Sequence, residues 1–211
     1  MSAASYEIRL CLNPACGLRY PLIEAHPFGE RCPACLGETQ VALKRTLSTQ
    51  PSSSRKNTCT GVKAALLDNI RSAWNVGSIF RTSEGLGIET LYLCGTTPTP
   101  ENKSVRKTSL GAEDYVDWEY SLNALEMAKK LKREGQTLIA LEQDTRAYNL
   151  TECQIQNSKS PIIILGNEVT GVDPEILDLC DQIVHIPMRG QKRSFNVEVA
   201  FAIAAYTLGQ T

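Results

Sequence analysis

Four cysteines near the N-terminus have the spacing of a metal site. Cys11 and Cys16 form one pair, and fifteen residues separate it from a second pair, Cys32 and Cys35. A glycine or proline beside each pair can bend the backbone, so the sequence predicts two turns that bring four thiols together. Four thiolates complete the tetrahedral ligand set of a structural zinc ion, and a segment of roughly 40 residues with few large apolar side chains needs such a link to fold.

The cysteine spacing leaves other interpretations open. The pairs could form disulfides, which a reducing compartment disfavours, or Cys32 and Cys35 could form a redox pair. An iron–sulfur cluster is a further alternative, and His26 could replace one cysteine as a ligand. A zinc ion that performs catalysis is disfavoured, because four cysteines leave no open coordination position. The expectation is a structural zinc site.

A first polar segment, residues 67–82, begins at the end of a predicted strand and continues into a helix. Asn75 is predicted to cap this helix. Arg81 shares a helical stripe with Gly77 and Gly85, so its side chain is expected to stand above small residues and to be open to a phosphate or another ligand. A solvated arginine and a capping asparagine would explain the same residues without any function.

A second polar segment, residues 162–174, runs from a buried strand into a loop with a glycine at each end. Gly166 and Gly171 would allow the backbone to approach a ligand closely. Glu168, inside the loop, could accept hydrogen bonds from a ribose or orient a cationic group. Turn chemistry alone would also account for the two glycines.

A third polar segment, residues 186–200, leads from a strand through a basic loop into the last helix. Ser194 and Asn196 open that helix, whose first turn offers free backbone N–H donors beside a hydroxyl and an amide. Taken alone, this segment is also a good helix cap.

The elements that must position these segments alternate between strands and helices. Apolar runs predict strands at 62–67, 88–93, 137–141, 161–165 and 183–188, and helical patterns cover 76–86, 122–134, 174–180 and 196–208. Such alternation predicts an α/β fold with a mostly parallel sheet covered by helices. Ligands in these folds bind at the carboxyl ends of the strands.

Composition and charge set limits on the class of protein. The 211 residues are 42% hydrophobic and 21% charged, and the formal net charge is −1, so charge neither demands nor excludes a nucleic acid. Residues 48–57 have no apolar side chain to pack, which predicts a cysteine-rich domain at 1–47, a linker at 48–60 and an α/β domain at 61–211. No signal peptide or membrane span is evident, so a cytoplasmic protein without a membrane partner is expected.

In their order and spacing, the three polar segments together resemble the motifs of the SpoU/TrmH family of RNA methyltransferases. The motif residues are Asn75 with Arg81, then 165–171, then 186–197, and the stretches 93–100 and 107–113 are similar to the family as well. The resemblance covers roughly residues 62–209. Two departures are visible: Phe195 stands where the family often has Leu or Met, and Glu198 stands where it commonly has a small polar residue.

Membership of that family implies a fold, a reaction and a set of site residues. It implies a C-terminal trefoil knot, a homodimer, and transfer of a methyl group from S-adenosylmethionine to an RNA ribose 2′-hydroxyl. The implied catalytic residues are Arg81, Asn75, Glu168, Ser194 and Asn196. The implied cofactor-binding residues are Leu141, Gly166, Ile186, Ser194 and Phe195.

The resemblance leaves the substrate and the role of the N-terminal domain open. Either tRNA or ribosomal RNA could be the substrate, and a catalytically silent RNA-binding member of the fold is an alternative. The cysteine-rich domain is expected to be a zinc ribbon, which could dock RNA through surrounding basic residues or serve as a structural cap. The candidate basic residues are Arg9, Arg19, Arg31, Lys44 and Arg45.

Overall fold

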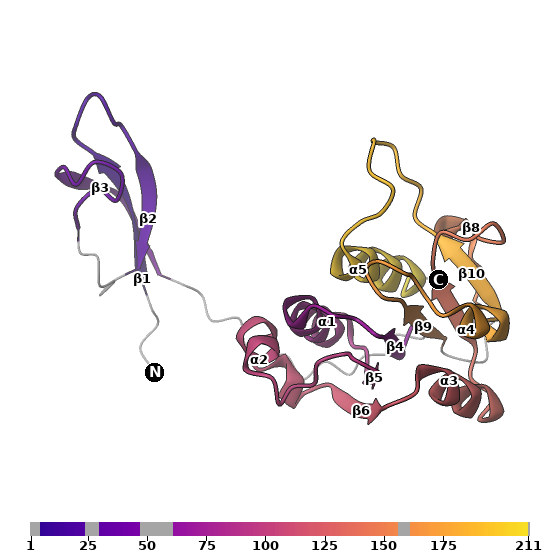
Figure 1. Ribbon diagram of the computed structural model, residues 1–211. Coiled ribbons are helices and arrows are strands. Elements are labelled where there is room, and N and C mark those ends of the chain that lie inside the picture. The colour runs from indigo at the N-terminus through magenta and orange to yellow at the C-terminus, as the bar shows by residue number, and fades with distance from the viewer. Residues whose placement is uncertain (1–4, 24–29, 47–60, 156–160, 211) are drawn as a thin grey trace. The chain divides into compact units, whose positions relative to one another are not determined.

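The computed structural model (Figure 1) describes residues 5–23, 30–46, 61–155 and 161–210. The chain divides into two compact units, Met1–Lys56 and Asn57–Thr211. The predicted linker at 48–60 lies outside the described residues, as does His26. The boundaries of the linker therefore stay a prediction.

The N-terminal unit is a small antiparallel sheet. It consists of β1 (Ser5–Cys11), β2 (Arg19–Ile23) and β3 (Thr39–Thr46), with β1 in the centre. A register shift between Ile8 and Arg9 interrupts the pairing of β1 with β3. Most of β3 is exposed, so the unit has little apolar core of its own.

Seven parallel strands form the sheet of the C-terminal unit. The sequence predicted a mostly parallel sheet and five of these strands, but not β6 or β8. The strands are β4 (Ala64–Asp68), β5 (Thr90–Cys94), β6 (Asp117–Ser121), β7 (Leu138–Leu141), β8 (Tyr148–Asn149), β9 (Ile162–Leu165) and β10 (Gln182–His185). Their order is β6-β5-β4-β9-β7-β10-β8, and all neighbouring pairs are parallel. β9 therefore lies between β4 and β7, although it follows both in the sequence.

Helices cover both faces of this sheet. They are α1 (Ala73–Leu86), α2 (Lys103–Ser109), α3 (Ala124–Arg133), α4 (Pro174–Leu179) and α5 (Val197–Leu208), with short 3₁₀ helices η1 (Ala112–Asp114) and η2 (Leu150–Glu152). α1 and α5 pack on one face, and α3 and α4 on the other. Adjacent residues of a central strand consequently point into two different cores: Leu66 packs towards α3 and Leu67 towards α1.

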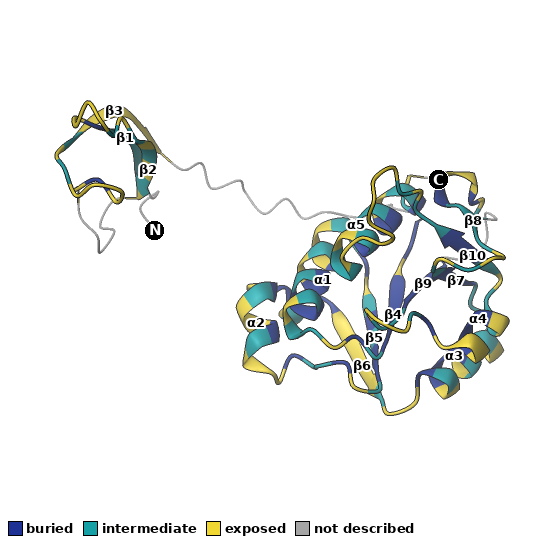
Figure 2. Cartoon of the chain, turned by 45° about the horizontal axis from the view of Figure 1, so that its top comes forward, coloured by how far each residue is buried: buried dark blue, intermediate teal, exposed yellow. Residues whose placement is uncertain are grey.

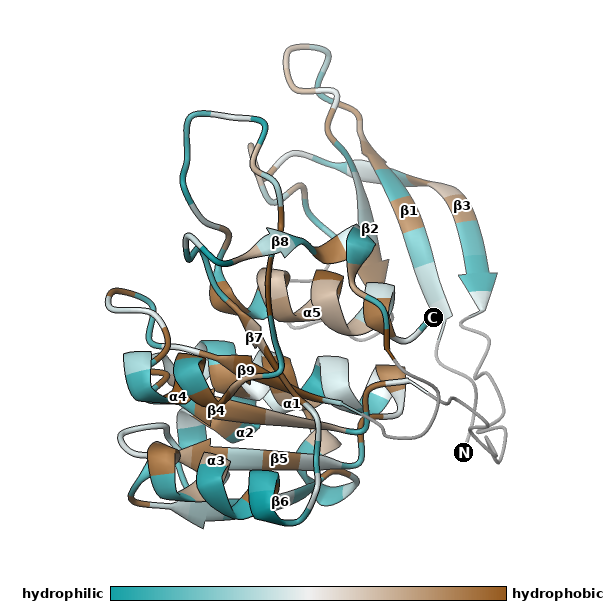
Figure 3. Cartoon of the chain, turned by 90° about the vertical axis from the view of Figure 1, so that its right-hand side faces the viewer, coloured by the Kyte–Doolittle hydropathy of each residue, from teal (hydrophilic) through white to brown (hydrophobic). Residues whose placement is uncertain are grey.

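Burial on both faces explains why the central strands are continuous apolar runs. Figure 2 shows these strands as buried, and Figure 3 shows β4, β7 and β9 as hydrophobic along their length. β6 lies at the sheet edge and is largely exposed, with charged and aromatic residues. Its mixed sequence gave no apolar run, which is why sequence patterns missed it; the short helix α2 was missed as well.

The structure corrects the start of one predicted helix and the end of one predicted strand. α1 begins at Ala73, because the Ser72 hydroxyl accepts from the backbone N–H of Asn75 and caps the helix. Asn75 is therefore inside the first turn and is not the cap. β10 ends at His185, whereas the sequence predicted a strand as far as residue 188.

In the described part of the chain, no helix has both the length and the apolar character needed to cross a bilayer.

Candidate active site

A cavity of about 540 Å³ opens at the carboxyl ends of β7, β9 and β10. Parallel sheets bind ligands at this edge, particularly where the strand order reverses. The predicted site residues that line the cavity are Asn75, Leu141, Gly166, Glu168, Ile186, Ser194, Phe195 and Asn196. All three polar segments thus contribute to one cavity.

Glu168 connects the loop after β9 to the start of α1. Its carboxylate accepts hydrogen bonds from the backbone N–H groups of Arg71 (3.0 Å) and Ser72 (3.1 Å) and from the side-chain amide of Asn75 (3.2 Å). Partial burial raises the pKa of Glu168, but these donors outweigh that effect and hold the pKa below its ordinary value. The carboxylate is therefore a fixed negative charge at the positive end of a helix.

Asn75 connects the same carboxylate to the start of α5. Its amide nitrogen donates to Glu168, and its amide oxygen accepts from the side-chain nitrogen of Asn196 over 3.1 Å. Asn196 caps α5, because its own oxygen accepts from the backbone N–H of Glu198 over 2.9 Å. Each amide of the pair therefore uses both its donor and its acceptor, which fixes its orientation.

The loop after β9 is folded tightly on itself. The backbones of Asn167 and Gly171 exchange two hydrogen bonds, of 3.1 and 2.9 Å. A Cβ on Gly166 would lie 2.1 Å from the carbonyl carbon of Gly171 and from the nitrogen of Val172. Gly171 has φ +76°, and a Cβ there would meet the Glu142 carboxylate at 2.4 Å. Both glycines are therefore required by close approach within the protein itself, which agrees with the turn explanation that the sequence left open. Approach of this backbone to a ligand stays a prediction.

Glu142 and Gln143 line the cavity and were missed by sequence reasoning. The Glu142 carboxylate accepts from the backbone N–H of Val172 over 2.9 Å, and the Gln143 amide donates to the carbonyl of Arg193. These bonds join the loop after β7 to the loops after β9 and β10. Glu142 and Gln143 directly follow a predicted strand, and this position in the sequence could have identified them as candidate site residues.

Arg81 lies apart from the residues at the cavity. It is exposed and lines a second hollow, between α1, α2 and the first turn of α5. Six residues along a helix turn the side-chain direction through about 600°, so Arg81 and Asn75 point about 120° apart. The side chains of Arg81 and Asn75 therefore do not face the same hollow. Gly77, on the expected open stripe, is buried against α2.

In the N-terminal unit, the four predicted cysteine ligands lie together. Their sulfur atoms are all within 4.8 Å of one another, with 3.4 Å between Cys11 and Cys35 and 3.7 Å between Cys16 and Cys32. Four sulfurs at about 2.3 Å from a central zinc would be about 3.8 Å apart, whereas a disulfide requires about 2 Å. The donor set and its spacing therefore fit a four-coordinate metal and not two disulfides.

One basic residue near the cysteines is not available to a nucleic acid. Arg9 is 4% exposed, and its guanidinium pairs with Glu7 at 2.7 Å and donates to the Thr39 hydroxyl at 2.8 Å. Lys44 is exposed but lies 3.9 Å from the same Glu7 carboxylate. Arg9 is thus a structural residue of the sheet, which corrects its place among the candidate RNA-docking residues.

Together, the fold and the cavity are those of an α/β domain with a ligand-sized hollow at the carboxyl ends of its parallel strands. A profile of the SpoU rRNA Methylase family matches residues 64–206, which is most of the chain. The protein belongs to this family. The N-terminal unit lies outside the matched region.

Curated relatives named as tRNA methyltransferases and as rRNA methyltransferases are similar to this chain. A tRNA (guanosine(18)-2′-O)-methyltransferase from Borreliella burgdorferi is 29% identical over 154 residues, which cover 72% of this chain and 68% of that protein. The 23S rRNA (guanosine(2553)-2′-O)-methyltransferase RlmP from Bacillus subtilis is 29% identical over 150 residues, which cover 71% of this chain and 58% of that protein. The match to RlmP thus spans less than two thirds of that relative's own length.

Solved structures share the fold. A TrmH/SpoU tRNA-modifying enzyme from A. aeolicus superimposes with a TM-score of 0.62 at 27% identity, covering 70% of this chain and 74% of that chain. An AdoMet-bound rRNA methyltransferase from Sinorhizobium meliloti has a TM-score of 0.66 at 21% identity, covering 71% of this chain and 56% of that chain. The second likeness establishes the fold alone.

Proposed function

We propose that this protein transfers a methyl group from S-adenosylmethionine to a ribose 2′-hydroxyl of tRNA or ribosomal RNA. The observation that carries the proposal is the linkage of Asn75, Glu168 and Asn196 at one cavity, because each comes from a different one of the three family motifs. The relatives act on tRNA and on rRNA. The class of RNA therefore stays open in the proposal.

The cavity has the properties expected of an S-adenosylmethionine site. Its volume, about 540 Å³, lies in the range of about 300–1,000 Å³ typical of small-molecule sites. Gly166 contributes to the lining of the cavity, and the apolar side chains of Leu141, Ile186 and Phe195 would supply surface for an adenine ring. The proposed binding residues are Leu141, Gly166, Ile186, Ser194 and Phe195. Bound there, the cofactor would supply the methyl group.

The protein's own residues are proposed to position the ribose and to stabilise charge on its oxygen. Glu168 and Asn196 hold the Asn75 amide at the cavity, and Ser194 shapes the adjoining loop. Arg81 lies in the second hollow, so its proposed role requires RNA that extends from the cavity to that hollow. There it is proposed to bind the phosphate of the target nucleotide and to stabilise negative charge on the 2′-oxygen. A guanidinium stays protonated, so the proton leaves through the phosphate or water and not through Arg81.

The experiment that tests this function combines transfer to RNA with cofactor binding. Wild-type protein should transfer label from S-adenosylmethionine to RNA as 2′-O-methylated nucleotides, and sequencing of the methylated sites would identify tRNA or rRNA. Arg81→Ala should lower the rate at least about 100-fold while cofactor affinity is retained. Arg133→Ala, an exposed arginine at the end of α3, is the matched control and should leave both unchanged.

Three outcomes would contradict parts of this proposal. Methylation of bases alone would overturn the ribose assignment. RNA binding without any transfer would support the catalytically silent alternative. Near-normal turnover of Arg81→Ala would remove Arg81 from the catalytic residues.

We also propose that the protein is a homodimer. α5 is apolar over most of its length, yet Val199 and Tyr206 are 40% and 59% exposed on it. A second copy packed on this helix would cover both side chains. Sedimentation of the wild type as a dimer and of Tyr206→Glu as a monomer would support this, whereas a monomeric wild type would refute it.

The C-terminal segment is proposed to form the trefoil knot expected for the family. The supporting contacts are those that gather the loops after β7, β9 and β10, namely Glu142 with Val172 and Gln143 with Arg193. α5 then packs against α1 and against β7 and β9.

For the N-terminal unit we propose a structural zinc ion bound by Cys11, Cys16, Cys32 and Cys35, and a role in docking RNA. Arg19, Arg31 and Arg45 are exposed on this unit, in contrast to Arg9. Replacing these three with Gln should weaken RNA binding and flatten its dependence on salt. An unchanged slope would favour a structural cap. A cytoplasmic location is part of the same proposal, because thiols remain reduced there.

A further inference from the structure

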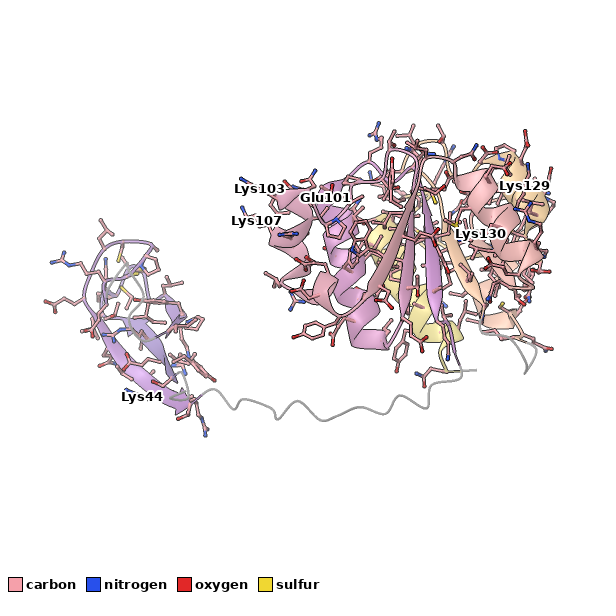
Figure 4. All side chains as sticks on the ribbon, turned by 90° about the horizontal axis from the view of Figure 1, so that it is seen from below. Lys44, Glu101, Lys103, Lys107, Lys129 and Lys130 are labelled. Atoms are coloured by element: carbon pink, nitrogen blue, oxygen red, sulfur yellow. The ribbon has the colours of Figure 1, made fainter. Side chains whose placement is uncertain are left out.

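A basic and aromatic surface lies on α1 and α2, outside the cavity. α2 and its caps, residues 102–110, carry Lys103, Arg106 and Lys107 and no Asp or Glu. Figure 4 shows Lys103 and Lys107 together on α2, with Glu101 beside them and with Lys129 and Lys130 well away on α3. The α3 lysines pair with Glu126 and Glu119, so they differ from the α2 lysines in being locally neutralised.

Trp74 is the aromatic part of this surface. It lies in the first turn of α1, is 56% exposed, and has the ammonium of Lys107 5.4 Å from its ring centroid. A tryptophan left this exposed loses the hydrophobic stabilisation that burial would give, so a partner that covers the ring is expected. The cation near the ring also raises the local positive charge.

Close packing of the two helices fixes this arrangement. A Cβ on Gly77 would lie 1.9 Å from the Thr108 hydroxyl and 2.3 Å from the carbonyl of Val105, so α2 rests directly on the backbone of α1. Trp74 is one helical turn before Gly77, and Lys107 immediately precedes Thr108. The backbone positions that carry Trp74 and Lys107 are therefore held close together by direct contact between the two helices.

The same surface continues into the hollow that contains Arg81. Ser78, Arg81 and Thr82 of α1 face Lys107 and Thr108 of α2 there. Glu198 of α5 lines the hollow too, and its carboxylate accepts from the Thr82 hydroxyl at 3.1 Å. The Glu198 carboxylate repels phosphate, so a bound phosphate is expected on the other side of the hollow, beside Lys107 and Arg81.

We propose that Trp74 and Lys107 bind the single-stranded RNA segment next to the target nucleotide, whose own phosphate is assigned to Arg81. The indole stacks one base, and the Lys107 ammonium contacts a phosphate. A protein partner is less consistent with this surface, because lysine is depleted at the centres of protein interfaces. Trp74 directly precedes Asn75 at the cavity, so RNA on this surface adjoins the proposed reaction site. This inference rests on the proposed action on RNA.

The test measures RNA affinity of full-length variants with a labelled, unstructured oligouridine of about 15 nucleotides, long enough for a typical single-strand site. Trp74→Ala should weaken binding about five- to 100-fold, and Trp74→Phe should retain most of the affinity because it keeps a stacking face. Lys107→Gln should weaken binding and lower the slope of log affinity against log salt by about 0.7. S-adenosylmethionine affinity should stay unchanged in all three.

Two control variants are available elsewhere in the unit. Lys129→Gln removes a partly exposed lysine from α3 on the opposite face of the sheet, and Trp118→Ala removes a half-exposed tryptophan from the edge strand β6. Neither should change RNA affinity. If Trp74→Ala misfolds and loses cofactor binding, the proposal is tested by comparing Lys107→Gln with Lys129→Gln. Equal salt dependence of RNA affinity in these two variants would overturn the proposal.

Other outcomes separate this inference from the proposed function. RNA affinity and methyl transfer that are unchanged in Trp74→Ala would overturn the inference and leave the function standing. Loss of RNA affinity in Trp74→Ala, in a protein that methylates no RNA, would support the surface and refute the function. A change in oligomeric state with unchanged RNA affinity would assign the surface to a second copy of the chain and overturn the inference.

Discussion

The side-chain amide of Asn196 donates a hydrogen bond of 3.1 Å to the side-chain oxygen of Asn75, 121 positions earlier in the chain. The same Asn75 donates to Glu168 over 3.2 Å. The start of α1, the loop after β9 and the start of α5 are therefore held by one chain of side-chain hydrogen bonds. Each of these segments also lines the cavity.

Asn75→Ala should uncouple these three segments. The substitution removes two side-chain hydrogen bonds, so we expect a loss of about 1–2 kcal/mol in the free energy of unfolding and a several-fold weaker affinity for S-adenosylmethionine. Asn123→Ala is the matched control, because Asn123 caps α3 away from the cavity and should cost about 1 kcal/mol without changing cofactor affinity. Denaturant titration and calorimetry would measure both quantities. Equal cofactor affinity in the two variants would contradict the coupling.

Glu168→Gln should alter how stability depends on pH. The pKa of Glu168 is lowered in the folded protein, so its ionised form stabilises the fold above the ordinary carboxyl pKa of 4.5. That contribution is lost as pH falls through the lowered pKa, while glutamine is insensitive to pH. Wild type should be the more stable protein at pH 7, and its advantage should shrink below about pH 4.5. A constant difference in urea midpoint between pH 7 and pH 3.5 would count against this role.

Gly166→Ala and Gly85→Ala should have opposite effects. A Cβ on Gly166 would lie 2.1 Å from backbone atoms of the same loop, so we expect a loss of about 2 kcal/mol or more and weak cofactor binding. A Cβ on Gly85, near the end of α1, meets nothing within 4 Å. Alanine there should raise stability by about 0.5–1 kcal/mol. Thermal unfolding of the pair would test this, and a tolerated Gly166→Ala would show that the loop can open.

Removal of metal should affect the two units differently. We expect one zinc per chain by elemental analysis, and a chelator should unfold the β1–β3 sheet while cofactor affinity persists. Cys35→Ser should lower the zinc content, and Cys153→Ser, a buried cysteine outside the cluster, should not. Iron in the purified protein, or disulfides detected by mass spectrometry, would instead support one of the other interpretations of the cysteine spacing.

Local sequence patterns were sufficient to predict most elements and the residues around the cavity. Apolar runs predicted the central strands, because strands buried on both faces carry no polar alternation. The carboxyl ends of parallel strands meet at one edge, which is why the sequence alone places Glu168, Ser194 and Asn196 near each other. The cysteine spacing likewise predicted the group of four sulfurs, since each pair is held by its own turn.

Tertiary structure decided the features that depend on contacts distant in sequence. The hollow that Arg81 lines, the burial of Arg9 by Glu7 and Thr39, and the packing of α2 on Gly77 depend on partners that no local pattern names. Asn75 proved to be a bridge and not a cap, because Ser72 took the capping position and Asn196 arrived from the far end of the chain. The sequence determined which polar residues the protein brings to the edge of its sheet, and only the packing of its helices decided which of them contact one another.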